Sequence, residues 1–194
     1  MAGGQSRRLG RNKAVEPFEG QPLMLRVAGR LSTLCDELVV VLADASKAGE
    51  MPIPAGARVA QDEYPNKGSL GGIYTGLHHA ANPWAIVVAC DMPFLNTGLL
   101  AHLLSLREGS DAVVPVVEGR PEPTHAVYGK ACLPAIRGRI ERDSLKIAGF
   151  FEDVRVAYLP EQEVRRFDPE LLSFFNVNNQ EDLDRALGLA KEGR

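Results

Sequence analysis

Apolar positions along the chain follow two alternating patterns. Short runs rich in Val, Ile and Leu predict strands, and stretches with apolar residues three to four positions apart predict amphipathic helices. The expected strands are 38–42, 57–61, 84–90, 112–117, 124–128 and 154–159. The expected helices are 22–34, 70–81, 97–107, 130–136, 143–151 and 180–191. This alternation is typical of an α/β protein whose mostly parallel central sheet is flanked by helices.

The segment 84–90, Trp-Ala-Ile-Val-Val-Ala-Cys, is apolar at every position. Such a run is typical of a central parallel strand that is buried on both faces. Ligands of open α/β sheets bind beyond the carboxyl ends of the strands. Polar residues that directly follow expected strands, such as Asp62 and Asp91, are therefore candidates for a binding site.

Composition excludes several classes of protein. A chain of 194 residues with 45% hydrophobic and 24% charged residues fits one globular domain, residues 1–194. The formal net charge of −3 argues against a nucleic-acid binder, and no apolar run approaches the roughly 20 residues of a membrane span. Cys35, Cys90 and Cys132 form no C-x-x-C pair. Together with the lack of a signal-peptide pattern, they favour a cytoplasmic protein with reduced thiols.

The first 13 residues, MAGGQSRRLGRNK, form a glycine-rich and basic segment. Glycines let successive backbone N–H groups face one anion, and the arginines and Lys13 add positive charge. The segment matches neither the P-loop nor the dinucleotide fingerprint G-x-G-x-x-G. From composition alone, a phosphate-binding loop and a solvated basic terminus both remain open.

The string A-G-G-x-S-x-R-x-G-x-x-K in this segment resembles the signature of the molybdenum cofactor guanylyltransferase family, nucleotidyltransferases with a Rossmann-like fold. The matching positions are Gly3, Gly4, Ser6, Arg8, Gly10 and Lys13. The resemblance implies that the loop from Met1 and Ala2 onward wraps a nucleotide triphosphate, with Lys13 and Arg8 on its oxygens. A-G-G resembles the guanylyl more than the cytidylyl members. Asn12 stands where the family often has Asp.

A second block, QDEYPNKGSLGG at 61–72, is similar to the family's loop for guanine and ribose. The matching positions are Asp62, Gly68, Leu70, Gly71 and Gly72. The carboxylate of Asp62 could accept both N1–H and the exocyclic amine of guanine. Ser69 replaces a proline, and Leu42 stands where the family commonly has Asn near the base, with Asp44 as a possible substitute. The same stretch also fits a simple turn before a helix.

Asp91 follows the most apolar expected strand, in the sequence Cys-Asp-Met-Pro. Mg²⁺ prefers one or two carboxylates together with phosphate oxygens and water. The family has a closely similar C-D-x-P whose Asp binds the metal, so the resemblance implies that Asp91 binds Mg²⁺. A helix cap or turn residue is the alternative.

The segment FFNVNNQEDL at 174–183 resembles the family's F-x-N-V-N-x-P-E-D-L, in which the asparagines lie toward the pterin. Asn176 and Asn178 would share one face of a strand, although Asn178 or Asn179 could instead cap the following helix. His125 is a weaker candidate for the acceptor side. His78 and His79 are adjacent on an expected helix, so we expect their side chains to point apart and to form no metal site.

The resemblance implies a Mg²⁺-dependent enzyme that transfers GMP from GTP to the phosphate of molybdopterin and releases pyrophosphate. Molybdoenzymes or other cofactor-biosynthesis proteins would be its protein partners, with no nucleic acid or membrane involved. Two alternatives remain open at this point. One is transfer from CTP, or to another acceptor such as a sugar phosphate; the other is a non-catalytic cofactor carrier.

Relatives of this family begin with an apolar strand of about five residues before A-G-G. Here Met1 stands in the place of the last residue of that strand. A central strand buries apolar side chains, each of which stabilises the fold by roughly 1.5–3 kcal/mol. We therefore expect that the first strand is truncated in this sequence and that the native product extends upstream. Mass spectrometry of the protein from its own cell would test this expectation.

Overall fold

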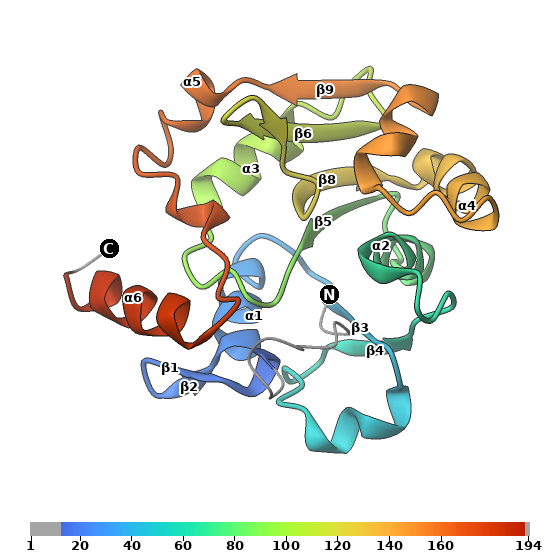
Figure 1. Ribbon diagram of the computed structural model, residues 1–194. Coiled ribbons are helices and arrows are strands. Elements are labelled where there is room, and N and C mark those ends of the chain that lie inside the picture. The colour runs from blue at the N-terminus through green and yellow to red at the C-terminus, as the bar shows by residue number, and fades with distance from the viewer. Residues whose placement is uncertain (1–12, 193–194) are drawn as a thin grey trace.

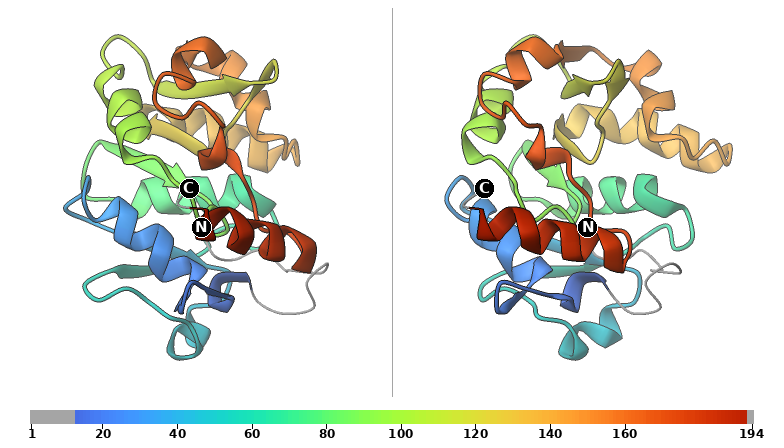
Figure 2. Two further views of the ribbon diagram at one scale, coloured as in Figure 1. Left: turned by 90° about the vertical axis from the view of Figure 1, so that its left-hand side faces the viewer. Right: turned by 60° about the vertical axis from the view of Figure 1, so that its left-hand side comes forward.

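Helices lie on both sides of a β-sheet in the computed structural model, which describes residues 13–192 (Figures 1 and 2). Its main strands are β3 (Val39–Leu42), β4 (Arg58–Gln61), β5 (Trp84–Val88), β6 (Ala112–Val117), β8 (His125–Gly129) and β9 (Val156–Leu159). All six coincide with strands expected from the sequence, to within two residues at each end. The α/β class, with helices around a central sheet, is confirmed.

Strand directions are more mixed than the mostly parallel sheet that we expected. β3 runs parallel to β4 and β6 runs parallel to β9, whereas β8 runs antiparallel to both β5 and β6. The connection from β6 to β8 is short and contains only the small strand β7 (Arg120–Pro121). A parallel return would need a crossover of a dozen or more residues, so β8 has to run antiparallel to β6.

Two tight hairpins were not expected from the sequence. One joins β1 (Pro17–Phe18) to β2 (Gln21–Pro22), and the other joins β6 to β7. In each turn an acidic residue and a glycine have positive φ, namely Glu19 (48°), Gly20 (82°), Glu118 (50°) and Gly119 (73°). Two central residues with positive φ match the twist of the flanking strands, which is why such turns close hairpins.

The α-helices are α1 (Leu23–Leu31), α2 (Gly68–His79), α3 (Thr97–Ser105), α4 (Leu133–Glu141), α5 (Glu161–Val164) and α6 (Gln180–Lys191). Short 3₁₀ helices lie at η1 (Lys13–Val15), η2 (Ala45–Glu50), η3 (Lys130–Cys132), η4 (Ile147–Asp153) and η5 (Leu172–Phe174). Within residues 13–192, a membrane-crossing helix of sufficient length and apolar character is not found.

Two of the expected helices were wrong in extent. The helix expected at 130–136 begins as an α-helix only at Leu133, so that Pro134 falls in its first turn, where a missing N–H is tolerated. The helix expected at 143–151 is instead the 3₁₀ segment η4. Asp143 has φ of 55°, which is incompatible with a right-handed helix, so no helix can run through it.

The core has a separate cluster on each face of the sheet. On one face α2 and α4 pack against β5, β6 and β8 through Leu70, Tyr74, Ile136 and their neighbours. On the other face α1 and α3 pack through Val27, Leu99 and their neighbours. A third, smaller cluster joins α6 to the β1–β2 hairpin and the start of α1, and α6 lies beside them in Figures 1 and 2. This third cluster holds the C-terminal segment against the N-terminal part of the described chain.

The sheet is divided between β3 and β5. Among the described residues, β3 pairs with β4 and β5 pairs with β8, and no strand ladder joins β3 to β5. A mainly apolar cavity of about 420 Å³ lies between them, lined by residues 38–41, residues 84–88 and the inner side of α1. The upstream strand proposed from the sequence stays a prediction.

Candidate active site

Three polar side chains from distant parts of the sequence meet at one end of the sheet. Lys13 begins η1, Asp91 follows β5, and Asn178 precedes α6. The Nζ atom of Lys13 lies 3.1 Å from Oδ2 of Asp91 and donates a hydrogen bond of 2.8 Å to Oδ1 of Asn178. The structure therefore joins the basic N-terminal segment, the loop after β5 and the C-terminal segment around one amine.

Backbone contacts fix the position of Asn178. The N–H of Val177 donates to the carbonyl oxygen of Asp91 at 2.9 Å, which ties the C-terminal segment to the loop after β5. The side chain of Asn179 accepts from the N–H of Asp182 at 2.8 Å and caps α6, while the Asp182 carboxylate accepts from the N–H of Asn178. The alternative that Asn179 caps this helix is therefore confirmed, and Asn178 remains available to Lys13.

The carboxylate of Asp91 is only half satisfied. Its Oδ2 pairs with Lys13, whereas its Oδ1 is buried and has no hydrogen-bond partner among the described residues. The side chains of Lys13 and Asp91 are 17% and 15% exposed. A buried carboxylate oxygen without a donor is unfavourable, so this atom is a ready ligand for a cation. Burial also raises the pKa of the neighbouring Cys90 thiol to about 11, so the thiol is protonated at neutral pH.

Contrary to the expectation from the sequence, Asn176 and Asn178 do not share one face of a strand. Residues 175–178 form no strand, because only the single bond from Val177 joins this segment to the end of β5. The side-chain amide of Asn176 donates to the carbonyl oxygen of Phe174 at 2.9 Å and contributes to a local turn. Of the pair, Asn178 is the one that contacts Lys13.

Asp62 lies in the loop between β4 and α2. Its Oδ1 accepts hydrogen bonds from the N–H of Tyr64 (3.0 Å) and from Oγ1 of Thr75 (3.1 Å). Thr75 is fully buried in α2, and its Oγ1 also accepts from the N–H of Glu63 at 3.0 Å. The loop is therefore held to α2 by one buried hydroxyl, and Oδ2 of Asp62 accepts no hydrogen bond within the described residues.

Two glycines let the loop approach α2 closely. Gly68 begins the helix with φ of 61°, a conformation that favours glycine. A Cβ atom on Gly71 would lie 2.8 Å from the carbonyl oxygen of Tyr64 and 3.2 Å from Oδ1 of Asp62. Gly71 is therefore required by packing, since any larger residue would push the loop off the helix.

Six of the expected site residues, Met1, Ala2, Gly3, Gly4, Ser6 and Arg8, lie outside the described residues. Leu42 is 3% exposed and belongs to the core, so its side chain offers no polar group to a ligand. Asp44 caps η2 through the N–H of Ser46. This contact does not test whether Asp44 takes the place of the asparagine that the family commonly has near the base.

His125 is enclosed rather than open to an acceptor. It is fully buried, its ring lies 4.6 Å from the ring of Phe174, and neither ring nitrogen has a hydrogen-bond partner among the described residues. Burial lowers the pKa of His125 to about 3, so the ring is neutral at physiological pH. Its visible role is packing behind the C-terminal segment that carries Asn178.

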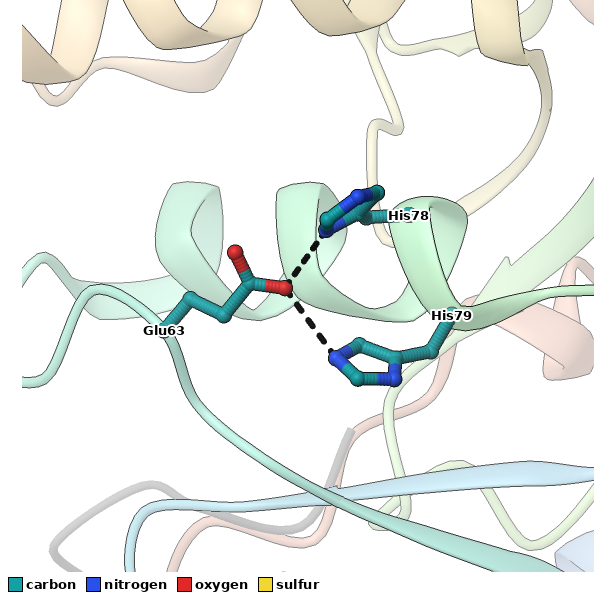
Figure 3. Close-up of side chains that lie close together, drawn as sticks. All are labelled: Glu63, His78 and His79. Atoms are coloured by element: carbon teal, nitrogen blue, oxygen red, sulfur yellow. Dashed lines mark hydrogen bonds and ion pairs between the residues drawn. The ribbon is translucent and has the colours of Figure 1, made fainter.

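Sequence reasoning missed a cluster at the far end of α2. The side chains of His78 and His79 do not point apart as expected but both meet the carboxylate of Glu63 (Figure 3). The expectation assumed ideal helical spacing, whereas α2 ends at His79. The pattern E-x₁₄-H-H carries no familiar signal, and only the approach of the loop to α2 brings these residues together.

The chain resembles known proteins over its full length. Residues 1–153 match the MobA-like NTP transferase domain. A protein of Desulfosudis oleivorans described as molybdenum cofactor guanylyltransferase is 33% identical, over 100% of this chain and 95% of its own length. The crystal structure of molybdopterin-guanine dinucleotide biosynthesis protein A from Archaeoglobus fulgidus superposes with a TM-score of 0.86 at 32% identity, covering 98% of this chain and 96% of that one.

A more distant structure carries information on the fold alone. The 2-C-methyl-D-erythritol 4-phosphate cytidylyltransferase of Thermus thermophilus covers 98% of this chain and 96% of its own with a TM-score of 0.71, at 20% identity. The nucleotidyltransferase architecture is thus shared well beyond recognisable sequence similarity. With the domain match and the full-length relatives, it follows that this chain is a nucleotidyltransferase that belongs to the molybdenum cofactor guanylyltransferase family of MobA-like NTP transferases.

Proposed function

We propose that this enzyme transfers GMP from GTP to the phosphate of molybdopterin, forming molybdopterin guanine dinucleotide and releasing pyrophosphate, with Mg²⁺ as the divalent ion. The family membership and the function of its relatives, described as molybdenum cofactor guanylyltransferases, support the reaction class. The single observation that carries the assignment is the meeting of Lys13, Asp91 and Asn178 around one amine.

Asp91 is the residue that would hold Mg²⁺. Its Oδ1 is buried without a donor, and a carboxylate oxygen of this kind fits an ion that takes one or two carboxylates plus phosphate oxygens. When bound, Mg²⁺ neutralises charge on the phosphates and orients them. The ion pair with Lys13 holds the Asp91 side chain at this position in the absence of substrate.

Lys13 supplies positive charge for the pyrophosphate that leaves. Its Nζ donates to Oδ2 of Asp91 and to Oδ1 of Asn178, so two oxygens from distant parts of the sequence orient the amine. Because an ammonium group has three donor hydrogens, it can bind a phosphate oxygen while keeping one of these contacts. Arg8 and the backbone of Gly3, Gly4 and Ser6 are proposed to bind the same triphosphate, on the basis of the sequence signature.

Asp62 is proposed to recognise guanine with one oxygen rather than two. Its Oδ1 is already occupied by Tyr64 and Thr75, which leaves Oδ2 to accept from N1–H or the exocyclic amine of the base. The two-point recognition expected from the sequence would require Thr75 to release the carboxylate. Gly68 would let the loop backbone pass close to the ribose.

The chemical step needs no protein nucleophile. The acceptor phosphate is already an anion and attacks the α-phosphorus in line, so the tasks of the protein are positioning and charge neutralisation. Asn178 and the segment around Asn176 are proposed to lie at the acceptor side, next to Lys13 and Asp91. Partner molybdoenzymes, and a cytoplasmic location, belong to the same proposal.

The test is turnover by the purified chain with GTP, Mg²⁺ and molybdopterin, followed by pyrophosphate release and by isolation of the dinucleotide. Asp91→Asn keeps the shape of the side chain and should lower kcat by about 10³-fold while GTP binding is largely retained. Asp184→Asn, on the exposed face of α6, is the matched control and should act like the wild type. Equal and negligible turnover in all three proteins, with GTP binding intact, would favour the carrier alternative.

A second candidate is the same reaction with CTP. The observation that favours it is Leu42, whose buried side chain replaces the polar residue expected near the base. A panel of GTP, CTP and ATP with molybdopterin, compared by kcat/KM, separates the candidates. The guanylyl assignment requires that GTP be preferred, and that Asp62→Asn reduce this preference more than it reduces turnover.

A further inference from the structure

Three potential metal ligands converge at the end of α2. Glu63 comes from the loop between β4 and α2, and His78 and His79 come from α2 itself, whereas Asp91 follows β5. Oε1 of Glu63 lies 2.6 Å from Nδ1 of His78 and 3.1 Å from Nε2 of His79 (Figure 3). The potential ligand atoms all lie within 4.8 Å of one another. The three side chains are between one third and one half exposed, so an ion from solvent can reach them.

The convergence has a local cause. Adjacent helical residues point about 100° apart, which would separate the two imidazoles. His79 is the last residue of α2, and Ala80 after it is extended. His78 presents the near nitrogen of its ring and His79 the far one, so the difference in reach compensates for the difference in direction. Glu63 approaches from the loop and lies between them.

The donor set suits a transition metal. Two imidazoles and one carboxylate are a common zinc ligand set that leaves a fourth position open, whereas Mg²⁺ and Ca²⁺ prefer oxygen ligands alone. Bonds of about 2.0–2.2 Å in a tetrahedron place ligand atoms about 3.3–3.6 Å apart. The separations of 2.6 and 3.1 Å to Glu63 are shorter than this, so the exposed side chains have to move apart by several tenths of an ångström to admit an ion.

We propose that Glu63, His78 and His79 bind a divalent transition-metal ion, with Zn²⁺ as the probe, at a site separate from the catalytic ion at Asp91. Binding fastens the loop 62–67 to the end of α2. The backbone N–H of Glu63 already donates to Thr75, and Thr75 donates to Asp62, so an ion at Glu63 restrains the same hydrogen-bonded loop from its outer side. That this loop contacts guanine rests on the proposed function; metal binding does not.

The site is tested by calorimetry on the full chain, stripped with chelator, titrated with Zn²⁺ at neutral pH without nucleotide. We expect one ion per chain in the wild type and an affinity lowered about 100-fold or more in His78→Ala and His79→Ala. Glu63→Gln keeps the hydrogen-bonding shape but removes the anionic ligand, and should weaken binding as well. His102→Ala removes a histidine of α3 that lies near Glu163 of α5, and it should leave the affinity unchanged.

A spectroscopic arm identifies the ligands. Co²⁺ in the wild type should give the visible absorption of a four-coordinate site with nitrogen and oxygen ligands, without the sulfur charge-transfer band that binding by Cys35, Cys90 or Cys132 would produce. Hydrogen exchange should show that Zn²⁺ slows the amides of 62–67 several-fold in the wild type but not in the histidine variants. Wild-type affinity in all three cluster variants, or a sulfur band, overturns the proposal.

Because no step of this test uses GTP or molybdopterin, its failure is distinguishable from failure of the proposed function. A chain that binds Zn²⁺ as described but does not turn over GTP would retain the site and lose the guanylyltransferase assignment. A chain that turns over GTP and binds no Zn²⁺ would do the reverse.

Discussion

The phosphate end and the base end of the candidate active site are built in opposite ways. At the phosphate end, Lys13 pairs with Asp91, 78 residues away, and with Asn178, 165 residues away. At the base end, Asp62 is held by Tyr64 and Thr75, two and 13 residues along the chain. The phosphate end therefore depends on the whole fold, whereas the base end depends on one loop and one helix. Nucleotide preference can change within that loop without disturbing the charged centre.

The largest effect is expected at the phosphate end. Lys13→Met preserves much of the side-chain volume but removes the charge that faces Asp91, and it should lower kcat/KM by about 10²- to 10³-fold. Pyrophosphate release under saturating Mg²⁺ measures the effect. Lys47→Met, on the exposed surface of η2, is the control. A Lys13→Met enzyme within about fivefold of the control would mean that the long-range assembly is not catalytic.

A smaller effect is expected from forcing the base loop off α2. The Cβ of Gly71→Ala would lie 2.8 Å from the Tyr64 carbonyl oxygen, and overpacking of this kind costs about 1–3 kcal/mol. If that cost falls on nucleotide binding, KM for GTP rises by about tenfold to 100-fold, with kcat little changed. Gly188→Ala in α6 meets no atom within 4 Å and should instead stabilise the protein by up to about 1 kcal/mol.

Acid should lower the stability of the folded protein through His125, which packs behind the C-terminal segment that carries Asn178. Its pKa is about 3 in the folded protein and 6.5 ordinarily, so the unfolded chain binds more protons between these values. Stability is therefore lost as pH falls below 6.5, by about 2 kcal/mol at pH 5. His125→Leu should remove this loss, as measured by urea unfolding at pH 7 and pH 5. An unchanged pH dependence in the variant would show that His125 is not the responsible group.

The smallest effect is expected from Thr75→Val. The substitution keeps the shape but leaves Glu63 N–H without its acceptor and releases one hydrogen bond to Asp62, a loss of about 1 kcal/mol. KM for GTP should rise about three- to tenfold, and Thr75→Ser should restore it. A lower kcat with unchanged KM would mean that Thr75 affects the phosphate end and not the binding of the base. That result would contradict the division between the two ends.

The sequence predicted what depends on local pattern. All six main strands followed from apolar periodicity. Lys13, Asp91 and Asp62 were named from their position and from resemblance to a family signature, and their roles in binding stay predictions. The contact between Lys13 and Asn178 could not be predicted, because it requires the path of the C-terminal segment past the end of β5. The antiparallel direction of β8 was missed because the apolar pattern of a strand does not show which strands it pairs with or in which direction it runs.

Other errors came from applying ideal geometry to the ends of elements. The helix expected across Asp143 ignored that a short polar residue can take positive φ. The separation expected for His78 and His79 ignored the end of α2 and the two different ring nitrogens. In both cases the error lies at the end of an element, where ideal helical geometry does not hold.

The division of the sheet between β3 and β5 has a consequence for local unfolding. Among the described residues, the β3–β4 pair shares no strand hydrogen bonds with β5, and it packs against α2. The backbone amides of β3 and β4 should therefore open to solvent at a lower free energy than those of β6 and β8. Amide exchange rates, compared strand by strand, measure the difference.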